Sequence, residues 1–170
     1  MSDDERWDLT DAAGAPLGRT HRRGDPVPEG SFHVVASVCV VRGDGLVLMT
    51  RRSAAKDWPL AWEFPAGSIL TGETSAEGAV RELAEEAGVR AAASDLRLAG
   101  RVTEDRALFD LYVARVADDP AVTLDPAEVS ESRWVSLDEA FRRCARGEMA
   151  GPWVRRLDEL GRPLATLVAG

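Results

Sequence analysis

The chain has 170 residues, of which 45 % are hydrophobic and 29 % are charged, and it carries a formal net charge of −8. This composition is typical of one globular domain, and a chain of this length buries enough surface to fold without disulfides or a structural metal. The acidic balance argues against a protein that wraps a nucleic-acid backbone, and the lack of a run of roughly 20 apolar residues argues against a membrane span.

The first third of the chain alternates strand and turn signals. Residues 7–18 predict two short strands around an Ala-Gly turn, and a polar loop containing proline and glycine follows at 19–30. Residues 32–41 and 46–50 are rich in β-branched and apolar side chains, and the Arg-Gly-Asp-Gly sequence between them predicts a hairpin turn. Their near-continuous apolar character predicts strands that are covered on both faces.

A helix is predicted next, after an aromatic-rich loop that ends at 62–67 with Trp-Glu-Phe-Pro-Ala-Gly. Small and apolar residues then recur at helical spacing, Thr74 and Glu77 form a capping-box signature, and Gly88 is placed to end the helix.

Strand character returns at 96–102 and 107–116, and a loop rich in Pro, Asp and Glu spans 118–131. A short strand is expected at 134–136.

Two further helices are predicted near the C-terminus. Ser136 opens a helix that runs to about Ala145, and 151–168 forms the last helix, interrupted near Gly-Arg-Pro at 161–163. Strands interleaved with two or three helices predict an α/β or α+β sandwich.

Three carboxylates share one face of the predicted central helix, because Glu82, Glu85 and Glu86 stand at i, i+3 and i+4. Their mutual repulsion is relieved if a divalent cation lies among them, and hard oxygen ligands with room for water suit Mg²⁺ or Mn²⁺. A solvated acidic helix face is the alternative that the spacing alone leaves open. Arg81 lies on the same helix, and Glu73 in the preceding loop is its natural ion-pair partner.

These residues form part of a longer pattern. From Gly67 the sequence reads Gly-x5-Glu-x7-Arg-Glu-hydrophobic-x-Glu-Glu-x-Gly-hydrophobic, which resembles the signature of the Nudix hydrolases at every fixed position. The resemblance implies an α/β/α sandwich with a mixed sheet. We therefore expect a single domain, 1–170, made of a Nudix core at 32–170 and an N-terminal hairpin and loop extension at 1–31.

The same resemblance implies a reaction and the residues that carry it. The expected activity is metal-dependent cleavage of the diphosphate linkage in a nucleoside diphosphate derivative or a (deoxy)nucleoside di- or triphosphate. By position, the ligands of Mg²⁺ or Mn²⁺ would be Glu82, Glu85, Glu86 and the Gly67 carbonyl, and the catalytic residues would be Glu85, Glu86, Arg81 and Glu73. Glu85 and Glu86 are local candidates for the general base, and Glu104 and Glu131 are later carboxylates that could reach the site.

Three segments, 7–18, 32–35 and 51–56, are similar to isopentenyl-diphosphate isomerases. In those enzymes an Arg and a Lys four residues later clamp the diphosphate, and Arg52 and Lys56 match them. Two cations beside an acidic site would hold an anionic diphosphate that the net charge repels. The catalytic Cys and His of the isomerases have no counterpart at 65–70, so isomerisation is not expected. Hydrolysis of an isoprenoid-type diphosphate remains the alternative.

The aromatic side chains near the signature are candidates for substrate contact. Trp58, Trp62 and Phe64 flank the expected site, where their rings could stack on a base, line an apolar pocket or belong to the core. We expect Trp62 and Phe64 to join Arg52 and Lys56 in binding substrate.

The expected partner is a small-molecule diphosphate, with no nucleic acid and no membrane, and a homodimer is possible because many relatives pair through strands near the N-terminus. A non-catalytic Nudix protein that senses a nucleotide is a further alternative, but a pure binder needs no complete set of metal-ligating carboxylates. Cys39 and Cys144 lie far apart and no secretory signal is visible, so a reduced, cytoplasmic protein is expected.

Overall fold

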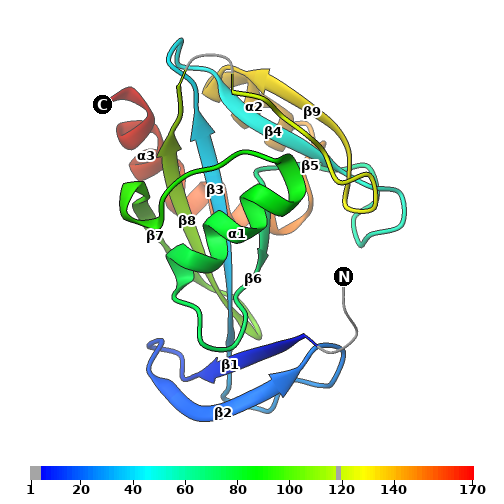
Figure 1. Cartoon of the computed structure of the whole chain (residues 1–170), viewed down its shortest axis with the longest axis vertical. Helices are drawn as coiled ribbons and strands as arrows, with labels where there is room; N and C mark the ends of the chain where they lie inside the picture. Colours follow the sequence, from blue (N-terminus) through cyan, green and yellow to red (C-terminus); the bar gives the residue numbers. More distant parts are fainter. Residues whose placement is uncertain (1–4, 118–119) are drawn as a thin grey trace.

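The computed structural model describes residues 5–117 and 120–170. Within them, a seven-stranded mixed sheet is built from β3 (His33–Val41), β4 (Val47–Arg52), β5 (Trp62–Glu63), β6 (Ala66–Ser68), β7 (Arg97–Thr103), β8 (Ala107–Arg115) and β9 (Val129–Val135). The strand order is β5-β4-β3-β8-β7, with β6 paired to β3 and β9 paired to β4 (Figure 1).

The central strand β3 uses its two edges differently. One edge pairs with β8 in parallel along the whole strand, from His33 to Val41. The other edge is shared, because β4 pairs with it only where Val41 lies opposite Val47, while β6 pairs with positions 35–37. β4 therefore diverges from β3 and leaves a fork between β4 and β6.

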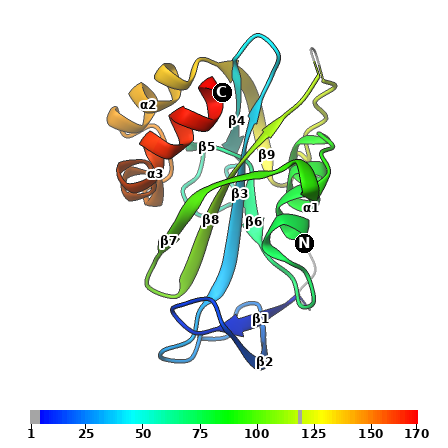
Figure 2. The same cartoon turned by 90° about the vertical axis from the view of Figure 1, so that its left-hand side faces the viewer.

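Helices cover both faces of the sheet. α1 (Ser75–Ala87) lies on one face, and α2 (Leu137–Ala145) and α3 (Pro152–Ala169) lie on the other (Figure 2). A short 3₁₀ helix, η1 (Ala93–Asp95), follows α1. The predicted α/β/α sandwich with a mixed sheet is confirmed. No helix among the described residues is long and apolar enough to cross a lipid bilayer.

A separate hydrophobic cluster lies on each face of the sheet. Val38 of β3 belongs to the cluster that contains Leu83 of α1, whereas the next residue, Cys39, belongs to the cluster that contains Trp153 of α3. Successive side chains of a strand point to opposite faces, so the near-continuous apolar run at 32–41 reflects cover on both sides, as predicted.

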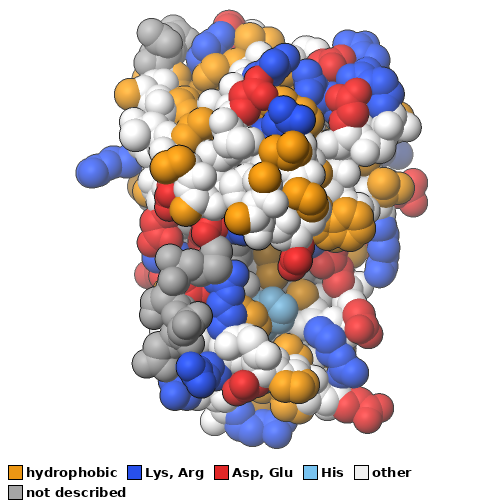
Figure 3. Space-filling model, turned by 90° about the vertical axis from the view of Figure 1, so that its right-hand side faces the viewer, with side chains coloured by type: hydrophobic (Ala, Val, Ile, Leu, Met, Phe, Trp, Pro, Cys, Tyr) orange, Lys and Arg blue, Asp and Glu red, His pale blue; other side chains and the backbone are white. Residues whose placement is uncertain are grey.

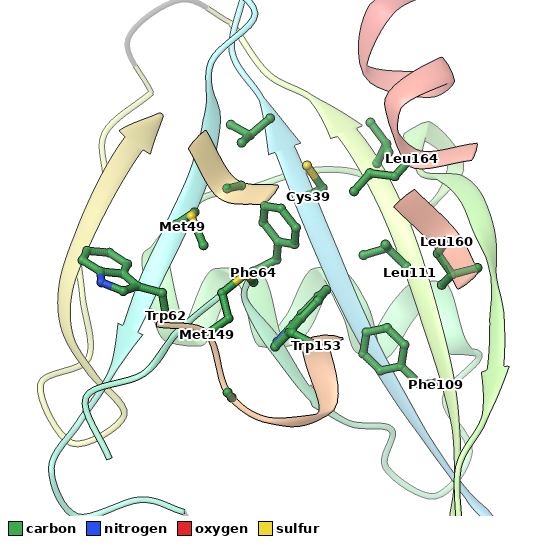
Figure 4. Packing of buried hydrophobic residues seen from close by; sticks show 14 of the residues in the cluster. Cys39, Met49, Trp62, Phe64, Phe109, Leu111, Met149, Trp153, Leu160 and Leu164 are labelled. Carbon is green, nitrogen blue, oxygen red and sulfur yellow. The ribbon is translucent and has the colours of Figure 1, made fainter. Parts of the chain in front are cut away.

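Aromatic rings fix α3 to the sheet (Figure 4). Trp153 is fully buried and makes edge contacts with Phe64 and Phe109, with ring centroids 5.2 and 5.4 Å apart. Such edge-to-face pairs add to the free energy of burial.

The predicted N-terminal hairpin is present as a separate two-stranded sheet of β1 (Arg6–Thr10) and β2 (Pro16–Arg22) at one end of the molecule (Figure 1). It is joined to the chain just before β3, because Thr10 and Phe32 exchange backbone hydrogen bonds of 2.8 and 2.9 Å. β2 extends to Arg22, so the loop predicted at 19–30 was wrong over its first four residues.

Two predictions near the C-terminus need correction. β9 begins at Val129 and not at 134, because its polar residues pair with β4, and such distant pairing leaves no local pattern in the sequence. α3 is not interrupted at 161–163, because Leu160 and Leu164 are buried on the same helix face and hold it against the sheet. Pro163 removes only one backbone donor from this long helix.

Candidate active site

A cavity of about 420 Å³ lies beside the fork between β4 and β6. Its walls come from α1, from β6, from the loop after β4, from the segment before β9 and from the N-terminal hairpin. Most of its lining is charged: Glu5, Arg23, Arg52, Lys56, Asp57, Glu82, Glu85, Glu86, Asp125 and Glu128. Figure 3 shows this side of the molecule, with basic and acidic side chains around a hollow above the hairpin.

The helix that carries the carboxylates begins and ends where the sequence predicts. The Thr74 side chain accepts a hydrogen bond from the Glu77 N–H, and the Glu77 side chain accepts one from the Thr74 N–H, which completes the capping box. Gly88 ends the helix with φ of 67°, a left-handed conformation that glycine adopts without strain.

Arg81 connects the helix to the loop before it. Its Nε and Nη2 donate to the two carboxylate oxygens of Glu73 at 2.8 and 3.0 Å, so the predicted ion pair is present. Its Nη1 also donates to Glu82 at 2.7 Å and to Glu85 at 3.3 Å. Although burial raises the pKa of Glu73, hydrogen bonds from Arg81 and the Leu70 N–H leave that pKa below its ordinary value. Glu73 is therefore ionised and locks the loop to α1.

Glu86 is the most buried carboxylate in the cavity wall, with 4 % of the residue exposed. The Ala66 N–H of β6 donates to its Oε2 at 3.2 Å. Burial, followed by the nearby negative charge of Glu63, raises the pKa of Glu86 to about 8. Burial likewise raises the pKa of Glu82. Two desolvated carboxylates at one site favour a cation between them.

Gly67 is required by the close approach of β6 to α1. A Cβ atom at this position would lie 2.0 Å from the carboxyl carbon of Glu82, well inside van der Waals contact. The absence of a side chain thus lets the Gly67 backbone and the Glu82 carboxylate face the same cavity.

We expect Gly67→Ala to weaken Mn²⁺ binding by about 10–100-fold, because the added methyl group displaces the Glu82 carboxylate. Titration calorimetry with Mn²⁺ alone measures this effect. Gly72→Ala is the control for backbone strain, because position 72 has a left-handed backbone but open space around it. Its Mn²⁺ affinity should stay closer to the wild-type value than that of Gly67→Ala. Equal losses in the two variants would contradict the steric explanation.

The two predicted cations reach the same cavity. Arg52, at the end of β4, donates from Nη1 to Glu63 at 2.8 Å and from Nε to the Asp57 carbonyl at 2.6 Å. Lys56 forms an ion pair with Glu128, which precedes β9. Burial lowers the pKa of Lys56. These contacts hold both cations at the cavity that the α1 carboxylates also line.

The predictions for Trp62 and Phe64 were wrong. Phe64 has no exposed surface and packs in the core against Trp153, so its ring cannot stack on a ligand. Trp62 is 6 % exposed in the same cluster, with the guanidinium of Arg143 4.7 Å from its ring centroid. Neither residue lines the cavity. The third aromatic residue, Trp58, is exposed beside the site but is also absent from the lining.

The two later carboxylates do not reach the site either. Glu104 makes two hydrogen bonds to Arg156, at 2.7 and 2.8 Å, and Glu131 is paired with Arg133 at 2.6 Å. Neither lines the cavity, whereas both local candidates for the general base, Glu85 and Glu86, do.

Several residues that line the cavity or pair with its lining escaped the sequence analysis. Glu63 could have been noticed, because it is a single carboxylate between two aromatic residues in an apolar run. Burial raises its pKa, and Arg52 is its direct partner. Glu5, Arg23 and Glu128 carry no local signal, because distant segments bring them to the cavity.

The donors around this cavity suit a divalent cation by their chemistry, although they are not gathered around one point. Within residues 5–117 and 120–170, no three acidic, histidine or cysteine side chains lie close enough together to hold an ion as they stand. Glu82 and Glu85 are instead paired with Arg81. The donors are nonetheless all hard oxygens, and the buried Glu86 carboxylate and the cradle at Gly67 fit Mg²⁺ or Mn²⁺.

The chain is similar to known proteins in sequence and in fold. Residues 31–157 match the NUDIX domain model. The chain is 32 % identical over 147 residues to the uncharacterized Nudix hydrolase lmo0368 of Listeria monocytogenes, covering 85 % of this chain and 87 % of that protein. It is 30 % identical over 138 residues to an isopentenyl-diphosphate Delta-isomerase of Cereibacter sphaeroides, covering 74 % and 76 %. The crystal structure of DR0079 from Deinococcus radiodurans is similar in fold, with a TM-score of 0.74, 24 % identity and coverage of 92 % and 99 %.

Proposed function

The chain belongs to the Nudix family of pyrophosphohydrolases, and from this we propose that it hydrolyses the diphosphate linkage of a nucleoside diphosphate derivative or a (deoxy)nucleoside di- or triphosphate. One observation carries the proposal: the carboxylates of α1 and the cations Arg52 and Lys56 line a single cavity. An anionic diphosphate needs both, because the cations bind its oxygens and the carboxylates hold a metal ion.

In this proposal each group has a defined role. Glu82, Glu85, Glu86 and the Gly67 carbonyl would hold Mg²⁺ or Mn²⁺, which when bound would neutralise negative charge on the phosphate oxygens and activate water. The ion pair of Arg81 with Glu73 fixes the loop and the helix in their relative positions. Arg52 and Lys56 bind and orient the diphosphate.

The ion pair between Arg52 and Glu63 prepares the site for substrate. The bonds to Glu63 and to the Asp57 carbonyl hold the guanidinium in place before substrate arrives. Less side-chain entropy is then lost when a phosphate binds, so orientation costs less free energy.

An isoprenoid diphosphate is the second candidate, favoured by the similarity to isopentenyl-diphosphate isomerases. A prenyl chain needs an extended apolar wall. The described lining offers only Val35 and two alanines, 55 and 66, besides its glycine and polar residues. The nearby aromatic rings of Trp62 and Phe64 are committed to the core. The nucleoside derivatives therefore rank first.

Turnover of a substrate panel tests the proposal. Nucleoside di- and triphosphates, nucleotide sugars, dinucleotides and isoprenoid diphosphates are incubated with Mg²⁺, with Mn²⁺ and with EDTA, and phosphate and monophosphate release is measured. We expect metal-dependent turnover of a nucleoside class, lost in EDTA and reduced about 10²-fold or more in Glu85→Gln. Glu159→Gln, on the exposed side of α3, is the matched control and should behave as wild type.

Binding without turnover of any compound would contradict the hydrolase proposal and would favour the nucleotide-sensing alternative. Turnover of isoprenoid diphosphates alone would reverse the ranking of the two substrate classes.

A further inference from the structure

The N-terminal hairpin forms one wall of the cavity, although it lies outside the segment 31–157 that matches the family model. Two residues at its open end, Glu5 and Arg23, contribute to the lining. The Arg23 N–H donates to the Glu5 carbonyl at 2.9 Å, and Arg23 Nη1 donates to Glu5 Oε2 at 2.6 Å. A cation is thus presented to the site by a part of the chain without any signature residue.

The hairpin is attached to the loop that leads into α1. The Thr71 N–H donates to the Arg6 carbonyl at 2.8 Å, and the Gly72 N–H donates to the Asp8 carboxylate at 2.9 Å. This loop also carries Glu73, the partner of Arg81. Hydrogen bonds therefore fix the hairpin to the loop, and the pair of Glu73 with Arg81 fixes the loop to α1.

A ring contact attaches the other side of the hairpin. Trp7 of β1 stacks on the imidazole of His33 at the start of β3, with centroids 4.3 Å apart and planes inclined by 17°. Trp7 is 9 % exposed, so this contact also buries apolar surface. Arg23 thus projects from a supported element.

Among the described residues, three cations line the cavity, and each is paired with a carboxylate: Arg23 with Glu5, Arg52 with Glu63 and Lys56 with Glu128. Arg52 and Lys56 belong to the wall formed by β4 and the loop after it, whereas Arg23 belongs to the hairpin wall. The cations are therefore divided between two walls.

Arg23 is also the most accessible of these cations. Its side chain is 37 % exposed, against 15 % for Arg52 and 19 % for Lys56. An ion pair that water reaches this readily contributes little free energy, so a doubly charged phosphoryl group can replace Glu5 as the partner of Arg23.

We propose that Arg23 selects the substrate by binding a third phosphoryl group, beyond the two that Arg52 and Lys56 hold, so that the site favours a nucleoside triphosphate over the matching diphosphate. This inference rests on the proposed function, because it assigns a further contact in the same cavity. It makes the hairpin a part of the substrate site.

Steady-state kinetics with one nucleoside as its di- and triphosphate tests the assignment. Arg23→Ala should raise KM for the triphosphate about tenfold, the loss expected for one charge-assisted contact, and change KM for the diphosphate less than about twofold. Arg23→Lys should recover part of the loss. Arg19→Ala, on the same hairpin but absent from the cavity lining, should match wild type for both substrates. Glu5→Gln should lower KM for the triphosphate, because Arg23 then lacks its competing carboxylate.

Equal changes of KM for the two substrates in Arg23→Ala, or no change for either, would overturn the assignment. Binding of non-hydrolysable di- and triphosphate analogues, measured by calorimetry on the same variants, separates this failure from failure of the proposed function. If the wild type hydrolyses neither nucleotide, and Arg23→Ala binds the triphosphate analogue more weakly than the wild type does, hydrolysis is refuted and the Arg23 contact is retained. Thermal unfolding of each variant establishes that it is folded.

Discussion

Glu86→Gln should lower metal-dependent turnover by about 10³-fold and, in metal-free solution at neutral or alkaline pH, should raise the free energy of unfolding. The loss of activity follows because a neutral amide is a poor ligand for a hard divalent cation. The gain in stability follows because the variant no longer buries an ionisable carboxyl group among other carboxylates. The Glu86 carboxylate is thus expected to be required for activity and to lower the stability of the metal-free fold.

The pH dependence of stability gives a second readout for the same substitution. The pKa of Glu86 is about 8 in the folded protein, against the ordinary value of 4.5 that applies to the unfolded chain. Between these values the folded state binds more protons than the unfolded state, so the stability of the metal-free wild type falls as pH rises through this window. Glu86→Gln lacks this contribution and should lose less stability over the same range.

Urea unfolding in EDTA, with wild type and Glu86→Gln compared at pH 5 and pH 8, measures the difference directly. Glu159→Gln, whose side chain lies on the exposed side of α3, is the control and should follow wild type. Parallel curves for wild type and Glu86→Gln would show that the Glu86 carboxylate is not desolvated. Full activity of Glu86→Gln would remove it from the metal site.

Phe64→Ala should reduce the free energy of unfolding by about 3–5 kcal/mol and leave KM unchanged at temperatures where the variant is folded. The ring has no exposed surface and contacts Trp153, so its removal leaves a cavity between the sheet and α3. A residue that stacked on the substrate would behave in the opposite way, with a raised KM and near-normal stability.

Chemical unfolding and steady-state kinetics on the same preparation distinguish these two behaviours. Val154→Ala, whose residue is 60 % exposed on α3, is the control and should change stability by less than about 0.5 kcal/mol. A loss of less than about 1 kcal/mol in Phe64→Ala would show that the core around Trp153 collapses easily or is not formed as described.

The features that the sequence predicted correctly depend on neighbours along the chain. The limits of α1 follow from Thr74, Glu77 and Gly88, which lie within the helix or next to it. The two residues of the Arg81–Glu73 ion pair are only eight positions apart in the chain. Local hydrogen bonds and helical spacing determine such features, so they leave a pattern that can be recognised before the fold is known.

The features that the sequence missed depend on contacts between distant segments. Strand β9 exists because 129–135 pairs with β4, more than 70 residues earlier in the chain. The same holds for the site, where Lys56 meets Glu128 and the hairpin supplies Arg23. Phe64 was misassigned for a related reason, since an aromatic residue next to a signature has the same sequence context whether it faces the ligand or the core.

The two sides of the fork between β4 and β6 are held by different strand pairings. The carboxylate wall is held by pairing of β6 with β3, and the cation wall is held by pairing of β4 with β9. Between the two, β3 and β4 meet only at Val41 and Val47. At the other end of the fork the segment 62–68 joins the two strands, because β5 pairs with β4 and only two residues separate it from β6 on β3. The width that a substrate spans is thus set at two places, the Val41–Val47 pair and the short link at 64–65, so substitutions there should change the width of the site and leave its charged groups in place.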